Sequence, residues 1–169
     1  MVNAVEDNNW THVVKALNAS EKLLQATLDG NEEAVARGID AAHDEHTSIL
    51  SYNDENSLSC VLSIAYYYAV NDYVIHREYA SGKGFLAKAS VPLGRAADLV
   101  LIPRKHVDSP AIVIELKYNK DADTAISQIK RKNYPDKVAQ YADRLLLVGI
   151  SYDRETKQHD CHIEKYEAT

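Results

Sequence analysis

A chain of 169 residues is long enough for one domain, or for one domain with an appendage. Hydrophobic residues make up 46% of it and charged residues 26%, so it can bury a core, and it is not disordered, collagenous or disulfide-rich. The net charge of −6 excludes a uniformly basic nucleic-acid binder but allows a local basic patch.

Other features of composition narrow the class of protein. No run approaches the roughly 18 apolar residues of a membrane span, and the polar N-terminus does not read as a secretory signal. Cys60 and Cys161 do not make a disulfide framework, so a reduced, cytoplasmic location is expected. Residues 1–60 carry 11 acidic and 3 basic side chains, which favours a surface for another domain in this first third.

The first fifty residues predict a helical extension, and residues 51–169 predict the main domain. Apolar side chains follow helical spacing over Trp10–Leu17, and a break with a new helix cap is expected at Asn18–Glu21. The next helix should stop at Asp29–Asn31, because Gly30 suits the left-handed position after a helix end. A third helix is expected over Glu32–Glu45.

The remaining chain alternates between strand and helix patterns. A strongly apolar helical face from Leu58 to Ala69 predicts a buried helix. Strands are expected over Tyr73–Tyr79, Ala97–Pro103, Ala111–Lys117, Arg144–Tyr152 and His159–Tyr166, and helices over Asp121–Asn133 and Pro135–Tyr141. Pro92 and Gly94 interrupt the segment Leu86–Ala96, which is expected to be an exposed excursion. The fold class is α/β: a small mixed sheet of four or five strands flanked by helices.

The candidate catalytic side chains lie on two of these strands. Asp98 opens one of them, and the next ends with Glu115, a spacer and Lys117. Residues i and i+2 of a strand share a face, so Glu115 and Lys117 project together, and a hairpin would bring Asp98 across from them. Two carboxylates and the Leu116 carbonyl would make an oxygen site suited to Mg²⁺ or Mn²⁺. The lysine could position a water. Together, the metal site and the lysine predict metal-assisted phosphodiester hydrolysis.

These residues, in this order, resemble the PD-(D/E)XK nuclease superfamily, whose fold is restriction-endonuclease-like. The resemblance extends to the nuclease-like domain at the C-terminus of bacterial AAA-ATPase-like proteins. It rests on six ordered segments: Tyr52–Cys60, Gly82–Phe85, Ala97–Pro103, Ile114–Tyr118, Gln128–Tyr134 and Leu147–Tyr152. The sequence departs from the family pattern at two places. Ala97 stands where the family usually has a proline, and the segment Leu86–Ala96 intervenes between Gly82–Phe85 and Ala97–Pro103.

The resemblance implies roles for individual residues. Asp98 and Glu115 match the metal-binding acids, and Lys117 matches the catalytic lysine. Glu55 matches the additional acid at the start of the first core helix. Gln128 and Tyr134 match an element that lies on the following helix near the substrate.

Each assignment has an ordinary alternative. The acids and Lys117 could form a strand-end salt bridge, and Glu55 could be a helix N-terminal acid. Gln128 and the basic run after it could be a solvated helix face. Within that run Arg131 and Lys132 share a face with Gln128 and are expected to contact phosphates, whereas Lys130 points about 200° away.

The sequence therefore predicts a divalent-metal-dependent nuclease with a nucleic acid, expected to be DNA, as substrate. The alternative is a non-catalytic module that senses nucleic acid or binds a protein, normally attached to an AAA-ATPase-like partner or parent domain. An oligomer is compatible with either function, and no membrane association is expected.

Overall fold

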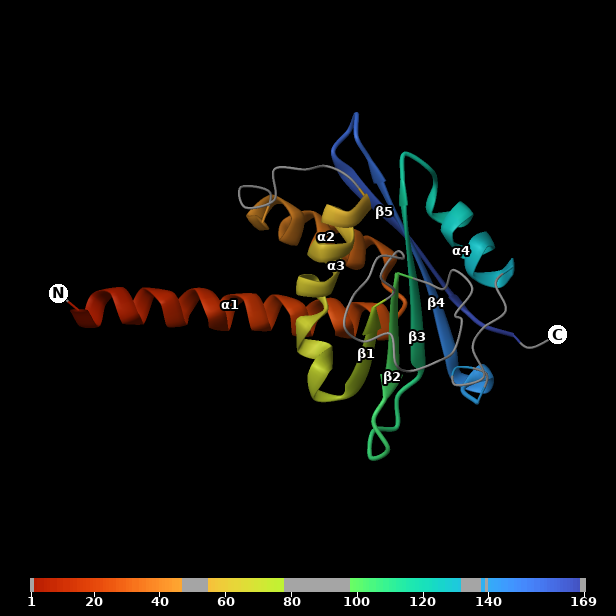
Figure 1. Cartoon of the computed structure of the whole chain (residues 1–169), viewed down its shortest axis with the longest axis horizontal. Helices are drawn as coiled ribbons and strands as arrows, with labels where there is room; N and C mark the ends of the chain where they lie inside the picture. Colours follow the sequence, from red (N-terminus) through yellow and green to blue (C-terminus); the bar gives the residue numbers. More distant parts are fainter. Residues whose placement is uncertain (1, 47–54, 78–97, 132–137, 139, 168–169) are drawn as a thin grey trace, which may run out of the picture.

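The computed structural model describes residues 2–46, 55–77, 98–131, 138 and 140–167 (Figure 1). In chain order the elements are α1 (Val2–Leu28), α2 (Glu32–His46), α3 (Glu55–Ala65), the 3₁₀ helix η1 (Tyr67–Asn71), β1 (Tyr73–Arg77), β2 (Leu99–Pro103), β3 (Ala111–Tyr118), α4 (Ala122–Arg131), the 3₁₀ helix η2 (Ala142–Arg144), β4 (Leu145–Asp153) and β5 (Gln158–Lys165).

The five strands form one mixed sheet in the order β1-β2-β3-β4-β5. Neighbouring strands are antiparallel except β3 and β4, which run parallel and are joined through α4. The central strands β3 and β4 are buried along almost their whole length, as their near-continuous apolar sequences predict. The expected α/β fold with a small mixed sheet is confirmed, and it is consistent with a restriction-endonuclease-like core.

Helices cover both faces of the sheet (Figure 1). On one face, α2, α3 and the C-terminal part of α1 pack over the larger core cluster, to which they contribute Leu24, Val35 and Leu58. On the other face, α4 packs over a smaller cluster with Val113 and Leu147. The helical extension over residues 1–50 therefore supplies part of the core, because α1 and α2 bury side chains against the sheet.

The expected break in the first helix is wrong: α1 runs without interruption through Asn18–Glu21. Ser20 is buried there, and its hydroxyl accepts a hydrogen bond from the Tyr68 backbone N–H at 2.9 Å. A serine that reads as a helix cap in the sequence thus serves a tertiary contact inside the helix. The predicted stop is confirmed, since α1 ends at Leu28 and Gly30, two residues later, has a φ of 70°.

Other boundaries differ by a few residues. The helix expected through Ala69 ends as an α-helix at Ala65 and is followed by η1. At α4, the Asp121 side chain accepts a hydrogen bond from the Thr124 backbone N–H at 2.6 Å and caps the helix. The predicted excursion over Leu86–Ala96 lies outside the described residues, as does most of the helix expected over Pro135–Tyr141. Within the described residues, no helix combines the length and apolar character needed to cross a membrane.

Candidate active site

Two acids from adjacent strands project from the face of the sheet that α4 covers. In the antiparallel register of β2 and β3, Leu99 pairs with Ile114 and Val100 with Val113. Continuing this register by one residue sets Asp98 opposite Glu115. Val100 and Val113 belong to the core on the α4 side, so alternation places Asp98 and Glu115 on that side as well. Lys117, two residues further along β3, shares the face.

Asp98 is half-buried directly before the first residue of β2. Its Oδ2 accepts a hydrogen bond from the Leu116 backbone N–H at 2.7 Å. The carboxylate thereby extends the pairing of β2 with β3 by one bond beyond the register. Asp98 therefore helps to fix the backbone between Glu115 and Lys117.

Glu115 is buried, with an exposed fraction of 3%. Its Oε1 accepts a hydrogen bond from Lys117 Nζ at 2.8 Å, and the Lys117 side chain is 12% exposed. The amide Nε2 of Gln128 on α4 donates to the same oxygen. Taking a carboxylate out of water is costly unless it is paired, and here a cation and an amide supply that pairing.

Gly149 sets how closely α4 approaches the sheet beside this group. It pairs with Glu115 in the parallel register of β3 and β4. A Cβ at this position would lie 2.4 Å from the Ala122 carbonyl oxygen and 3.0 Å from Ile126 Cγ1. The missing side chain therefore allows α4 to come near enough for Gln128 to reach Glu115. The sequence reasoning missed this residue; its signal is a lone glycine inside a buried apolar strand.

Charged pairs hold the outer side of α4 to the edge strand β5. His162 Nδ1 bonds to Asp123 near the start of α4, and Lys130 near its end pairs with Glu164. The hydrogen bond to Asp123 raises the pKa of His162 above its ordinary value, because the carboxylate favours the protonated ring. Lys130, expected to point away from the substrate side, thus binds a carboxylate of β5.

The other predicted site residues have different outcomes. Gln128 is half-buried and contacts Glu115, whereas Arg131, the last residue of α4, is exposed and donates to the Ser127 carbonyl at 3.3 Å. Glu55 begins α3, but its side chain lies outside the described residues. Lys132 and Tyr134 also lie outside them. Their predicted substrate contacts and the metal-binding role of the Leu116 carbonyl stay predictions.

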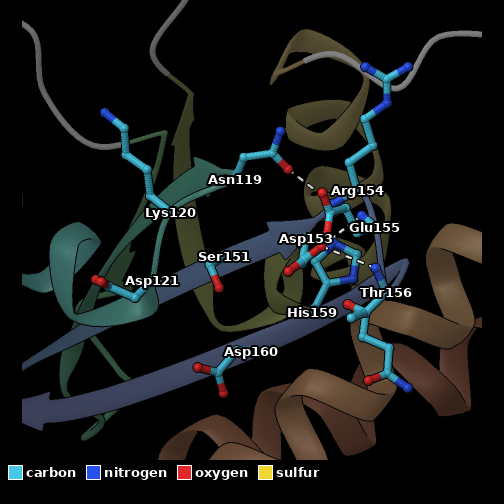
Figure 2. Close-up of a pocket in the computed structure, with 11 residues that line it drawn as sticks. Asn119, Lys120, Asp121, Ser151, Asp153, Arg154, Glu155, Thr156, His159 and Asp160 are labelled. Atoms are coloured by element: carbon cyan, nitrogen blue, oxygen red, sulfur yellow. Dashed lines mark hydrogen bonds between the residues drawn. The ribbon is translucent and has the colours of Figure 1, made fainter.

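An open depression lies at the ends of β3 and β4 (Figure 2), and its lining does not include Asp98 or Glu115. Its lining includes Asn119, whose side chain accepts a hydrogen bond from the Arg154 backbone N–H at 3.0 Å, and Ser151, the neighbour of Lys117 in the parallel register. His159 lines it as well, with Nδ1 at 2.8 Å from Asp40 Oδ1. Burial lowers the pKa of His159 below its ordinary value. The depression carries charges of both signs.

The donor atoms at Asp98 and Glu115 fit a hard divalent cation. Both are carboxylates, the ligand type that Mg²⁺ prefers, and they project from one face of adjacent strands. Among the side chains that the structure describes, no group of three or more His, Cys, Asp or Glu could hold a metal ion. A cation held by Asp98 and Glu115 would therefore need further ligands from backbone oxygen, water, substrate or residues beyond the described ones.

Comparison with models of known families gives a match for the greater part of the chain. The family model described as the PD-(D/E)XK nuclease superfamily matches residues 54–161, which span α3, β1 to β4, α4 and the first half of β5. No curated protein and no solved structure matches the chain.

Proposed function

The chain belongs to the PD-(D/E)XK nuclease superfamily, and on that premise we propose that it is a divalent-metal-dependent nuclease that hydrolyses phosphodiester bonds at Asp98, Glu115 and Lys117. The superfamily generally hydrolyses phosphodiester bonds. The observation that carries the proposal is the convergence of Lys117 and Gln128 on the buried carboxylate of Glu115. A strand-end salt bridge on a solvated edge would leave its carboxylate in water, whereas that of Glu115 is buried.

Each residue has a distinct part in the proposed reaction. Asp98 and Glu115 would hold Mg²⁺ or Mn²⁺ together with the Leu116 carbonyl, and the bound ion would neutralise negative charge that develops on the phosphate. Lys117 would orient the water that attacks phosphorus in line, and the bond to the leaving oxygen breaks. Gln128 would keep the Glu115 carboxylate in one orientation by donating its amide hydrogen.

Substrate contacts would extend along α4 from Gln128. Arg131 is exposed beyond it, and Lys132 and Tyr134 follow in the sequence. We expect Arg131 and Lys132 to neutralise backbone phosphates, so that their loss reduces the salt dependence of binding. DNA as the substrate, Glu55 as a further acid, a cytoplasmic location and an ATPase-like partner stay predictions from the sequence.

A cleavage assay tests the proposal directly. Purified protein is incubated with single- and double-stranded DNA and RNA in Mg²⁺, in Mn²⁺ and in EDTA, beside Lys117→Ala. We expect cleavage that needs the divalent ion and falls by at least about 100-fold in the variant, as expected for loss of a positioning group. Cleavage unchanged in Lys117→Ala would overturn the assignment of this site.

A binding measurement distinguishes the two functions considered from the sequence. Nucleic acid bound without cleavage by wild-type protein in both metals would favour the non-catalytic module. Binding that weakens with Arg131→Ala but not with Lys130→Ala would then place the nucleic acid on the exposed end of α4. Lys130 is the matched control, because its ammonium already pairs with Glu164.

A further inference from the structure

The first helix carries an apolar stripe that no other part of the described chain covers. Every residue from Trp10 to Ala19 is exposed, and α1 extends well beyond the rest of the molecule (Figure 1). Trp10, Val13, Val14 and Leu17 lie along one side of this part of α1, at intervals of three and four residues. Trp10 is 69% exposed. Such an exposed aromatic on a projecting helix is typical of an interaction surface.

The projecting half of α1 also lacks the packing that stabilises helices in proteins. A single helical segment of about 12–15 residues is marginal in water unless an apolar face is buried. Further along α1, Leu23 and Leu24 are buried against the core. Among the described residues, the stripe from Trp10 to Leu17 has no corresponding apolar surface to pack against.

A second exposed apolar patch lies beside the base of the projecting helix. Ile64 at the end of α3 and Tyr67 and Val70 in η1 follow one another at intervals of three residues, and all are exposed. The 3₁₀ helix η1 lies on the same side of α1 as the stripe. Glu21, four residues after Leu17 on that side, accepts a hydrogen bond from the Tyr68 hydroxyl at 3.1 Å. We call Ile64, Tyr67 and Val70 the η1 patch.

We propose that two copies of the chain form a two-fold dimer in which antiparallel α1 helices place the stripe of each copy against the η1 patch of the other. An antiparallel partner helix that lies along the stripe brings its own Trp10 toward the base of α1, where the η1 patch begins. Both surfaces are then used twice, as a two-fold interface requires. The proposal does not depend on the nuclease assignment.

The area of these surfaces agrees with a reciprocal contact. From the exposed fractions, the stripe and the η1 patch of two copies together offer about 900 Å² of apolar surface. With about 60% of an interface apolar, this corresponds to a total of about 1,500 Å², the size of a standard stable interface. The two stripes alone would bury about 800 Å² in total, which is the size of a non-specific contact. The η1 patch is therefore part of the proposed interface.

Molar mass measured by light scattering and sedimentation over a range of concentrations tests the proposal. We expect wild-type protein at micromolar concentration to have twice the 18.9 kDa mass of the chain. Trp10→Glu should raise the dimer dissociation constant by at least about 100-fold, because two tryptophan side chains leave the interface. Tyr67→Glu should weaken the dimer as well. His12→Glu is the matched control, because it adds the same charge two residues away, on the opposite side of α1.

A wild-type protein that stays monomeric at about 100 µM would overturn the proposal. A Trp10→Glu or Tyr67→Glu variant that dimerises as tightly as wild type would overturn it as well. Circular dichroism shows whether each variant keeps its helices. If Trp10→Glu loses helix, Val14→Glu, on the same side of α1, replaces it in the comparison with His12→Glu. Equal dimerisation of those two variants would also refute the interface.

Discussion

Replacing Gly149 with alanine should separate α4 from the candidate active site. The added Cβ would lie 2.4 Å from the carbonyl oxygen of Ala122 and 3.1 Å from Ala125 Cβ. A carbon and a carbonyl oxygen normally approach no closer than about 3.3 Å, so the start of α4 must move by about 1 Å. The nearest atom belongs to the backbone, so no change of rotamer can relieve the clash.

The expected cost follows from two opposing effects. Overpacking of a core lowers the free energy of unfolding by about 1–3 kcal/mol. Replacing glycine with alanine also lowers the entropy of the unfolded chain, which raises the free energy of unfolding by about 0.4–1 kcal/mol. The net loss of about 1–2 kcal/mol should lower the melting temperature by about 2–8 °C for a chain of this size. Because a misplacement of about 1 Å can reduce catalysis by about 100-fold, activity should fall much more than stability does.

Gly38→Ala on α2 is the matched control for this change. A Cβ there would lie 2.8 Å from Leu23 Cδ1, the flexible end of a side chain, and the next nearest atom is 3.8 Å away. Leu23 can adjust, and alanine gains about 1 kcal/mol of helix propensity over glycine, so stability should change little. Differential scanning calorimetry and the cleavage assay, run on both variants, measure the two effects. The reasoning would be refuted by a Gly149→Ala protein as stable and as active as wild type.

Two further predictions concern titratable groups. Asp98→Asn should abolish Mn²⁺ binding, measured by calorimetry. Its melting temperature should change little, because the amide oxygen can still accept the hydrogen bond from the Leu116 N–H. Asp98→Ala should in addition lose about 1 kcal/mol of stability, because that hydrogen bond is lost. Unchanged Mn²⁺ affinity in Asp98→Asn would exclude the site. His159 and His162 should give opposite pH dependence in urea unfolding between about pH 5 and 8. Burial lowers the pKa of His159 from 6.5, so the unfolded chain takes up that proton first and stability falls as the pH drops below 6.5. The bond to Asp123 raises the pKa of His162 from 6.5, so its contribution is complete below 6.5 and is lost as the pH rises through the higher folded value. Wild type should therefore lose stability relative to His159→Gln on acidification and gain it relative to His162→Gln. Slopes of the same sign would contradict one of the two assignments, and two reversed slopes would contradict both.

Periodicity predicted the sheet well because its strands are buried in a regular way. The apolar sequences of β3 and β4 are typical of strands covered on both faces, and the hairpin of β2 and β3 follows from their closeness in the chain. Local patterns predicted a helix break wrongly at Asn18–Glu21, where polar residues typical of a cap lie inside α1. Ser20 is held there by Tyr68, which is 48 residues away, and such a contact has no local signal.

The shared face of Asp98, Glu115 and Lys117 was predictable from the sequence, but the hydrogen bond from Gln128 that orients Glu115 was not. Alternation alone places Glu115 and Lys117 on one face, and the strand register adds Asp98. The hydrogen bond from Gln128 depends on how closely α4 approaches β4, which is set by Gly149 across the sheet. That distance is a property of three-dimensional packing, so periodicity along a single segment contains no information about it.

Glu115 shows why a break in a local pattern can mark a functional position. It is the only carboxylate that is buried among the described side chains, and it lies in a strand whose other central residues are aliphatic. An apolar residue of similar size would avoid the desolvation cost that the carboxylate incurs, since even a paired buried charge contributes little net stability. Packing therefore gives no reason for an acid at this point of β3. The bonds from Lys117 and Gln128 reduce the cost, and they also hold the carboxylate in a defined orientation on the face that Asp98 shares. A residue that costs stability and is nevertheless oriented by two neighbours is better explained by chemistry than by folding.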